Sequence, residues 1–550
     1  MFFRVKPSGP RRYLQLVENY WDGGRTKQRV LCTLGRLDQL QDSGQLDALL
    51  ASGTRFSQKI LLLTAHQNGQ VPVVTTRRLG PPLIFERLWH ELGCRDVLRE
   101  LLAGRHFEFA VERAVFLTVL HRLCATGSDR AAERWKRDYA LDGSADLQLH
   151  HLYRAMAWLG EELPQAQQQG STKLVPRCLK DVIEEHLFAR HRDLFTDLDV
   201  VFFDTTSLYF EGDGGDDLGH YGHSKDHRPD EHQMVVGAVL DGAGRPICCA
   251  LWPGNTSDVT TLIPIVDRLW RRFQIRQVCI VADRGMICQD TLADLEQQRW
   301  PYILGARMRR QTEVREEVLA AGGRFRVVHG PRQQAGDPAP LKVKDVRVEG
   351  RRYVVCVNEE EVASDRARRE AIVAALREQL TQGDKALVGN KGYRRYLKVE
   401  GEGHFAVDDA KLAEEGRYDG TWVLRTNTEL PAAEVALQYK RLWMVEHWFR
   451  ACKSLLATRP IYHQRDETIR GHVFCSFLAL LLRHELQARL EARGHELEWA
   501  EVMEDLERVQ YVEVEHTGKR FLLRSELQGT AGRVFQAVGV AAPPTVQQLA

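Results

Sequence analysis

Hydrophobic and polar residues alternate along the start of the chain in the manner of β-strands. Apolar side chains recur at every second position in YLQLVENY (13–20) and QRVLCTLG (28–35), on either side of a Gly-Gly sequence at 23–24. Alternation around a glycine turn predicts a β-hairpin. Residues 1–36 also contain eight Lys or Arg and only two acidic residues, so we expect a small basic β unit.

The apolar spacing changes to a helical period between residues 37 and 195. Apolar positions three and four residues apart occur in LIFERLWHELG (83–93), ERAVFLTVLHRLC (112–124) and HHLYRAMAWLGEEL (150–163), with Gly- and Asp-containing breaks between them. This period is typical of amphipathic helices. We therefore expect residues 37–195 to form a mainly helical region.

A strand pattern returns after residue 196 and alternates with helical segments. Strands are predicted at 198–210, 232–240, 245–252, 276–283 and 302–306, and helices at 257–273 and 291–298. The fourth of these strands is almost continuously apolar, as expected for a strand buried in a central sheet. Three strands followed by helix, strand, helix and strand predict a mixed α/β sheet over residues 196–306.

Residues 307–427 do not continue this sheet in an obvious way. They contain a predicted hairpin at 341–358, a helix at 364–380 with Ser364 as its N-cap, and a return strand at 416–427. We expect these residues to form an inserted subdomain.

The remaining residues predict two apolar helices and a tail. One long helix is expected at 432–456 and a second at 469–486, so residues 428–485 would return to the sheet domain. Residues 486–550 would form a C-terminal tail region, and we expect its last residues to be frayed.

The composition is that of a globular protein, with 43% hydrophobic and 27% charged residues. The apolar stretch at 474–482 is far shorter than the roughly 20 residues that a membrane helix needs. Because the N-terminus also has no secretory signal, we expect a cytoplasmic protein without membrane contact. The 11 cysteines include no CxxC pair, which favours buried free thiols over disulfides or zinc.

The net charge of +1 hides local basic surfaces. Residues 1–36 form one, and residues 301–333, with seven Arg against three Glu, form another. Such surfaces can bind a polyanion. A charge run is also typical of an ordinary solvated face, so the charge pattern alone leaves nucleic-acid binding open.

Two aspartates stand at the ends of predicted strands. Asp204 follows the apolar start of the first sheet strand, and Asp283 ends the buried strand at 276–283. A single Asp in this position is commonly a turn former or a helix cap. Two of them on one apolar sheet can converge at its edge, which makes the pair a candidate site.

A third carboxylate lies in the long predicted helix. Glu446 has Tyr439 seven residues before it and Lys453 seven residues after it. Because seven residues make almost two helical turns, the three side chains should share one face of the helix. Two Asp and one Glu supply the hard oxygen ligands that suit Mg²⁺ or Mn²⁺. Two such ions about 3.5–4 Å apart can drive an in-line phosphodiester displacement.

Histidines could be mistaken for a second metal site. His220, His223, His227 and His232 lie in a polar loop without a cysteine partner, which favours a solvated or DNA-facing loop over zinc. His472 lies in the apolar helix at 469–486, where a hydrogen-bonded structural histidine is the expected role.

Several motifs together resemble those of the bacterial insertion-sequence transposases of the DDE class, and most closely the insertion-sequence-four superfamily. The segments that carry the resemblance are DTTSLYFEG, HYGHSKDHRPD, WPGNTSD, ADRGM, YKRLWMVEHWFRACK and RPIYHQRDETIRGH. The resemblance covers roughly residues 195–485 and is weaker in the N-terminal half. It implies an α/β fold with a ribonuclease-H-like mixed-sheet catalytic core, a β-rich insertion, and a mainly helical N-terminal DNA-binding and dimerisation region.

The resemblance also assigns the candidate residues. Asp204, Asp283 and Glu446 would be the catalytic ligands of two Mg²⁺ ions, which Mn²⁺ could replace, and Tyr439 and Lys453 would contact the transposon end. In one departure, Leu442 stands where the family's signature helix often has Arg. Further DNA contacts are expected from Arg284, Lys440, Arg441 and Arg450.

The implied activity is cut-and-paste DNA transposition by a homodimer. The partners would be the terminal inverted repeats of the transposon and a target DNA, and the protein would act in the bacterial cytoplasm, on the nucleoid. A ribonuclease-H-like nuclease without strand transfer and a non-catalytic DNA-binding protein derived from a transposase are the two alternatives.

Overall fold

The computed structural model describes residues 2–22, 25–46, 48–49, 73–169, 171–172, 175–191, 199–275, 278–382, 395–400, 404–516 and 519–549. The chain divides into two compact units. Met1–Gly80, Asp138–Ala140 and Leu497–Ala550 form the first unit, and Pro81–Arg137 and Leu141–Glu496 form the second. This division is coarser than the six segments expected from the sequence, and it places the two ends of the chain in one unit.

The basic N-terminal residues form a three-stranded antiparallel sheet. The predicted hairpin is confirmed by β2 (Arg11–Asp22) and β3 (Arg25–Arg36), and its Gly-Gly turn lies outside the described residues. A third strand that the sequence did not predict, β1 (Phe2–Ser8), pairs with the other edge of β2. The short helix α1 (Leu37–Asp42) follows.

The first unit also contains a four-stranded sheet in the order β18-β17-β16-β4. Its strands are β4 (Val73–Arg78), β16 (Gln510–His516), β17 (Lys519–Arg524) and β18 (Val546–Gln548), accompanied by α17 (Trp499–Glu507) and α18 (Ala531–Val538). The prediction of a frayed tail is therefore wrong, as is the helical prediction for β4. β4 pairs with β16, which lies near the other end of the chain, and a local pattern carries no trace of such pairing.

The predicted helical region is confirmed in the second unit. Its helices are α3 (Gly80–Glu91), α4 (Cys94–Leu102), α5 (Val111–Cys124), α6 (Asp129–Trp135), α7 (Leu149–Leu159) and α8 (Leu179–Arg190). Helix α16 (Asp466–Glu491) packs against α5 and α7. Glycines allow this close crossing, because a Cβ on Gly471 would lie 1.9 Å from the Met156 carbonyl oxygen.

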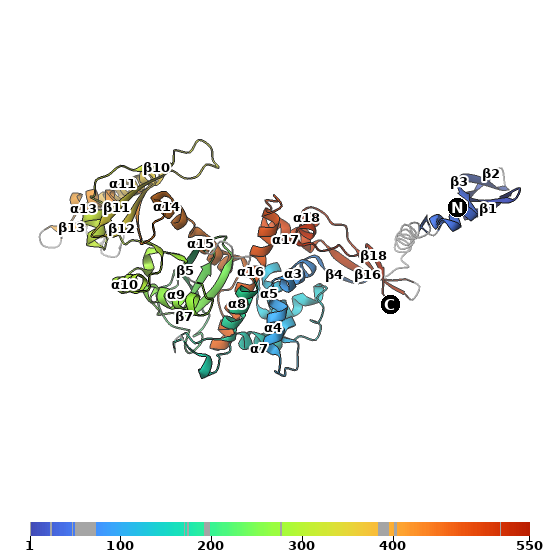
Figure 1. Ribbon diagram of the computed structural model, residues 1–550, viewed down its shortest axis with the longest axis horizontal. Helices are drawn as coiled ribbons and strands as arrows, with labels where there is room; N and C mark the ends of the chain where they lie inside the picture. The colour runs from blue at the N-terminus through green and yellow to red at the C-terminus, as the bar shows by residue number, and fades with distance from the viewer. Residues whose placement is uncertain are drawn as a thin grey trace. The chain divides into compact units, whose positions relative to one another are not determined.

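The second unit contains a nine-stranded mixed sheet in the order β10-β11-β12-β15-β9-β8-β5-β6-β7. Figure 1 labels β10, β11, β12, β5 and β7 of this sheet. The predicted core strands are β5 (Val200–Tyr209), β6 (Gln233–Leu240), β7 (Pro246–Pro253), β8 (Cys279–Ala282) and β9 (Tyr302–Gly305). Strands β5, β8 and β9 run parallel, whereas β5, β6 and β7 run antiparallel. The predicted mixed α/β fold class is thus confirmed.

Two helices cover part of this sheet through a shared apolar core. Helices α9 (Leu262–Arg271) and α10 (Gln289–Gln297) contribute Leu269 and Leu295, which are buried with Val201 and Phe203 of β5. Alternate residues of β5 therefore face this core, and the strand is held firmly where it leads to Asp204.

The predicted insertion extends the same sheet instead of standing apart from it. Its elements are β10 (Arg326–His329), β11 (Leu341–Val348), β12 (Arg351–Val357), α11 (Glu359–Gln382), the hairpin β13 (Leu397–Glu400) and β14 (His404–Val407), α13 (Asp409–Gly416) and β15 (Thr421–Thr426). Strand β15 pairs antiparallel with β9, a contact between segments too far apart in sequence for local pattern to reveal. Asn358, and not Ser364, caps α11, since its Oδ1 accepts the Glu360 N–H at 3.1 Å.

The long helix predicted at 432–456 is interrupted. Helix α14 (Ala432–Lys440) ends before a tight turn at 441–442, α15 (Trp443–Arg450) follows, and Ala451–Leu455 forms one π-helical turn. In the turn the Leu442 N–H bonds the Tyr439 carbonyl oxygen at 3.1 Å. Bonds of this i to i+3 type wind the chain more tightly than an α-helix does.

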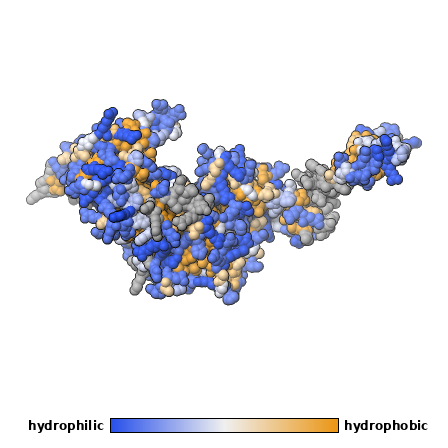
Figure 2. All heavy atoms as spheres, in the orientation of Figure 1, coloured by the Kyte–Doolittle hydropathy of each residue, from blue (hydrophilic) through white to orange (hydrophobic). Residues whose placement is uncertain are grey.

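Hydrophilic side chains cover most of the visible surface, with apolar side chains in small groups between them (Figure 2). None of the described helices combines the length and the apolar character needed to cross a membrane.

Candidate active site

Asp204 and Asp283 occupy matching positions on neighbouring parallel strands. Asp283 follows the last residue of β8, as predicted, whereas Asp204 lies in the middle of β5 and not at its end. Phe203 of β5 is in register with Ala282 of β8, and each aspartate is the next residue along its strand. Asp283 ends its strand at the start of a single 3₁₀ turn formed by Arg284–Met286. Parallel pairing therefore places the two predicted carboxylates side by side, where the pairing between β5 and β8 ends.

The surroundings of Asp204 raise its pKa to about 7. Burial is the largest cause, and repulsion from Asp283 and Asp258 adds to it. The Lys225 ammonium and the Thr205 N–H, which donates to Asp204 Oδ1 at 2.7 Å, act in the opposite direction. A buried carboxylate held close to other carboxylates is strongly stabilised by a cation, so the donor set fits a hard divalent ion.

Tyr439 holds the second aspartate. Its hydroxyl donates a hydrogen bond of 2.9 Å to Asp283 Oδ1. Gly305 of β9 leaves the room for it, because a Cβ at that position would lie 2.5 Å from the phenol oxygen. Burial and the neighbouring Asp283 raise the pKa of Tyr439, so the phenol stays protonated as a donor. The predicted DNA contact thus faces a predicted metal ligand.

Glu446 lies on α15, which packs against β5 and β6. Its side chain is exposed, whereas Val445, Trp448 and Phe449 of the same helix are buried. The carboxylates of Glu446, Asp204 and Asp283 do not gather within 4.8 Å of one another. Tyr439, Glu446 and Lys453 do not lie on one uninterrupted helix as predicted, because a turn at 441–442 ends α14 and a π-helical turn follows α15. Their shared face stays a prediction.

Two charged residues that the sequence did not single out join this site. Asp258 Oδ1 accepts the Thr205 hydroxyl at 2.7 Å, and its Oδ2 lies 3.1 Å from Lys225 Nζ. Lys225 also donates to the carbonyl oxygen of Thr205 at 2.8 Å. Both residues lie in motifs that carried the family resemblance, HYGHSKDHRPD and WPGNTSD, but nothing in their spacing indicated that they would meet beside Asp204.

Lys453 pairs with an acid of the same polar loop. Its Nζ lies 2.8 Å from Asp226 Oδ1, and Arg459 approaches the other carboxylate oxygen of Asp226 at 2.8 Å. Burial lowers the pKa of Lys453, and Asp226 opposes this effect. The amine predicted to contact the transposon end is therefore engaged within the protein in this structure.

The other predicted DNA contacts differ in their exposure. Arg284 and Arg450 are exposed. Lys440 lies over the Trp422 ring at 5.5 Å. Arg441 lies over a Phe ring of β5 at 5.6 Å and donates to the carbonyl oxygen of Gly242. Arg284 and Arg450 are thus the members of this group that are open to a ligand.

The histidines occupy two environments. His232 of the polar loop packs on Tyr221 with ring centroids 4.1 Å apart and bonds the Asp213 carbonyl oxygen at 2.8 Å. His472 is a hydrogen-bonded histidine within α16, as expected, with its Nε2 3.0 Å from the Thr458 carbonyl oxygen.

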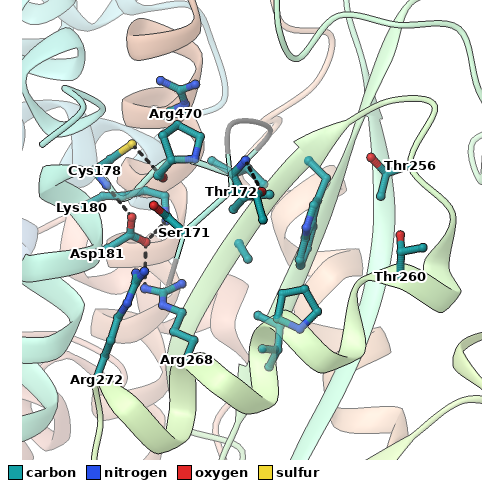
Figure 3. Close-up of a pocket in the computed structure, with 17 residues that line it drawn as sticks. Ser171, Thr172, Cys178, Lys180, Asp181, Thr256, Thr260, Arg268, Arg272 and Arg470 are labelled. Atoms are coloured by element: carbon teal, nitrogen blue, oxygen red, sulfur yellow. Dashed lines mark hydrogen bonds and ion pairs between the residues drawn. The ribbon is translucent and has the colours of Figure 1, made fainter. Parts of the chain in front are cut away.

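Charged side chains, among them Lys180, Asp181 and Arg268, line a separate cavity of about 250 Å³ (Figure 3). Arg268 and Lys180 both approach Asp181 Oδ1 at 2.8 Å, and Arg268 also pairs with the fully buried Glu184. None of the three predicted catalytic residues lines the cavity. The ion pairs of Arg268 with Asp181 and Glu184 join α9 to α8, so this network serves the fold.

Comparisons with individual known proteins give little information about this chain. No curated protein matches this chain in sequence. One solved structure that it resembles, the "Mos1 transposase paired-end complex with left transposon end", is 13% identical with a TM-score of 0.15, and the match covers 36% of this chain and 60% of that chain. A superposition this poor says nothing about the fold or the function of this protein.

Family models give a clear result. Residues 3–67 match the "IS1634 family transposase, N-terminal domain". Residues 195–482, slightly more than half of the chain, match the "Transposase DDE domain". Asp204, Asp283 and Glu446 all lie within this match. The protein therefore belongs to the DDE-type transposases of insertion sequences.

Proposed function

We propose that this protein catalyses cut-and-paste DNA transposition, in which it cleaves DNA at the transposon ends and joins the freed 3′-hydroxyl ends to a target DNA. The observation that carries the proposal is the pair Asp204 and Asp283, side by side on neighbouring parallel strands inside a DDE domain, with repulsion between them contributing to the raised pKa of Asp204. We also place the protein in the insertion-sequence-four superfamily, on the motifs that it shares with that group.

Asp204, Asp283 and Glu446 would hold the divalent ions, two Mg²⁺ or Mn²⁺ per site. When bound, such ions activate the attacking oxygen and stabilise the leaving oxygen of a phosphodiester displacement. Tyr439 orients Asp283 through its hydrogen bond. Lys225 lies close enough to Asp204 to favour the ionised form that an ion requires.

DNA would bind through basic side chains. The N-terminal sheet carries most of the positive charge of residues 1–36, and Arg284 and Arg450 are exposed in the DDE domain. The partners would be the terminal inverted repeats and a target DNA, bound by a homodimer because two ends must be joined in one complex. The protein would act in the bacterial cytoplasm on nucleoid DNA.

The experiment that tests this function uses purified protein, a donor DNA carrying the ends of its own element, Mg²⁺ and a target plasmid. We expect products in which donor ends are covalently joined to the plasmid. Cleavage without joining would instead support a ribonuclease-H-like nuclease. End binding without either reaction would support a non-catalytic DNA-binding protein.

A further inference from the structure

One hollow of the second unit is lined with arginines. It has a volume of about 980 Å³ and lies between the start of α6, helix α7 and the segment that leads into α16. Five arginines line it, and Asp129 is the single acid among its lining residues. We call it the arginine pocket; its arginines are Arg122, Arg130, Arg154, Arg459 and Arg465.

The floor of the arginine pocket does not suit a metal ion, although Asp129, His463 and His472 bring their ligand atoms within 4.8 Å of one another. Arg122 NH2 lies 2.9 Å from His472 Nδ1, the atom that would bind the metal. His463 Nε2 lies 3.4 Å from Asp129 Oδ2. The buried Arg122 guanidinium already balances the charge of Asp129, and it would repel a metal cation at this position.

The rim of the pocket presents free positive charge. Arg130 and Arg465 are exposed, and neither forms an ion pair with an acid in the described part of the chain. Arg154 approaches the exposed Glu108 at 3.6 Å, a pairing that water weakens strongly. Unpaired guanidinium groups around a hollow attract and bind anionic groups, phosphodiesters above all.

Aromatic side chains stand beside these charges. Tyr462 is 66% exposed and Tyr153 is 37% exposed, although both carry large apolar rings. Tyr153 packs edge-on against His463 with ring centroids 5.4 Å apart, which fixes its position. Basic side chains interleaved with exposed aromatic rings are the arrangement that binds single-stranded nucleic acid, because the rings stack on unpaired bases.

One cluster of ion pairs links a pocket residue to the loop beside the candidate active site. Arg459 of the pocket pairs with Asp226 at 2.8 Å. The preceding residue, Lys225, contacts both Thr205 and Asp258 beside Asp204. A strand that enters the pocket therefore lies next to the loop that reaches the carboxylates.

We propose that the arginine pocket binds unpaired nucleotides of a DNA strand that extends from the active site. The inference rests on the proposed function, to which it adds a binding site for single-stranded DNA. The volume lies at the upper end of the roughly 300–1,000 Å³ that enclosed ligand sites occupy, which suits a few nucleotides and is too small for a duplex. The exposed tyrosine rings would favour single-stranded DNA, because they can stack on unpaired bases and not on bases held in a duplex.

The test measures binding of a short fluorescein-labelled oligothymidylate by fluorescence anisotropy, in EDTA so that no DNA is cut. The Arg130→Ala/Arg465→Ala variant should bind more weakly. Its slope of log affinity against log salt should fall by about 1.4, since each lost phosphate contact to a single strand contributes about 0.7. The matched control is Arg368→Ala/Arg493→Ala, which removes two exposed arginines outside the pocket and should leave the slope unchanged.

A second pair of variants tests the aromatic contact. Tyr462→Ala should weaken binding about fivefold or more, as expected for one lost stacking contact, and Tyr462→Phe should bind like the wild type. Unchanged affinity and slope in the arginine and Tyr462→Ala variants would overturn the proposal. An equal loss of affinity for a duplex of the same length would overturn it too, because the pocket would then bind paired DNA.

The outcome is independent of catalysis. If the wild type fails to cut or join donor ends while these binding differences hold, the proposed function fails and the pocket remains a single-strand site. If the wild type joins ends normally and the pocket variants bind as the wild type does, only the pocket proposal fails.

Discussion

Replacing Asp204 by Asn should stabilise the metal-free protein. Folding raises the pKa of this carboxyl group from its usual 3.8 to about 7. Each pKa unit corresponds to about 1.4 kcal/mol, so holding the ionised form in the fold costs about 4 kcal/mol. Asn keeps the oxygen that accepts the Thr205 N–H and carries no charge, so the variant avoids this cost.

The sign of the pH dependence follows from the raised pKa. Between pH 3.8 and 7 the folded protein binds the Asp204 proton more tightly than the unfolded chain does, so its stability falls as pH rises. Below this window the two proteins should be equally stable. The advantage of Asp204→Asn should grow by about 3 kcal/mol between pH 5 and pH 8 and change little above pH 8.

The assay is urea unfolding of wild type and Asp204→Asn in EDTA at pH 5 and pH 8. Comparison of the two proteins at each pH cancels the other titrating groups that they share. Mg²⁺ should then stabilise the wild type at pH 8 and have little effect on the variant, because an ion that binds only the folded state adds stability by mass action. An advantage of the same size at both pH values would refute the reasoning, since Asp204 would then titrate as an exposed carboxyl.

Three further substitutions test the packing and the site. Gly471→Ala should lower the free energy of unfolding by about 1–3 kcal/mol or more, as for an overpacked core. Gly532→Ala, where an added Cβ meets nothing within 4 Å, should not destabilise the protein. Thermal melts of the two variants compare these effects. Tyr439→Phe should raise the Mg²⁺ concentration needed for half-maximal cleavage; an unchanged requirement would contradict its orienting role. Lys453→Ala should weaken the binding of transposon ends in mobility-shift titrations. It should also lower the melting temperature, because it leaves Asp226 buried with one cation fewer. A variant with wild-type stability and full affinity would show that Lys453 neither contacts DNA nor stabilises the fold through Asp226.

Sequence patterns predicted the elements that depend on local periodicity. The apolar runs of β5 and β8 predicted both strands and placed Asp283 at a strand end, because the residues of a buried strand are themselves apolar. Asp204 was predicted at the end of its strand but lies in the middle of β5. Pairing between distant strands was not predictable in this way. The strands β4 and β16, and β9 and β15, meet only because the whole chain folds.

The candidate site shows the same limit. Asp204 and Asp283 could be picked out from the sequence because each is an acidic residue directly after a run of apolar residues. Lys225 and Asp258 lie in polar loops, whose meeting point is set by the sheet and not by any repeat in the sequence. The interruption of the helix before Glu446 was missed because the residues at 441–442 are good helix formers and include neither Gly nor Pro.

The central claim is that Asp204, Asp283 and Glu446 act together as the metal site of a DNA transposase. Glu446 tests it most sharply, because its side chain is exposed and has to join the other two. Glu446→Gln keeps the size of the side chain and removes the charge that a divalent ion requires. Glu434→Gln is the matched control, since Glu434 is an exposed glutamate on the preceding helix.

The decisive measurement is the rate of end cleavage and strand transfer in Mg²⁺, with end binding measured on the same preparations. Glu446→Gln should lose both reactions and still bind transposon ends with wild-type affinity or better. Glu434→Gln should cut, join and bind as the wild type does. Near wild-type cleavage by Glu446→Gln would contradict the account, and loss of cleavage by Glu434→Gln alone would move the third ligand to that residue.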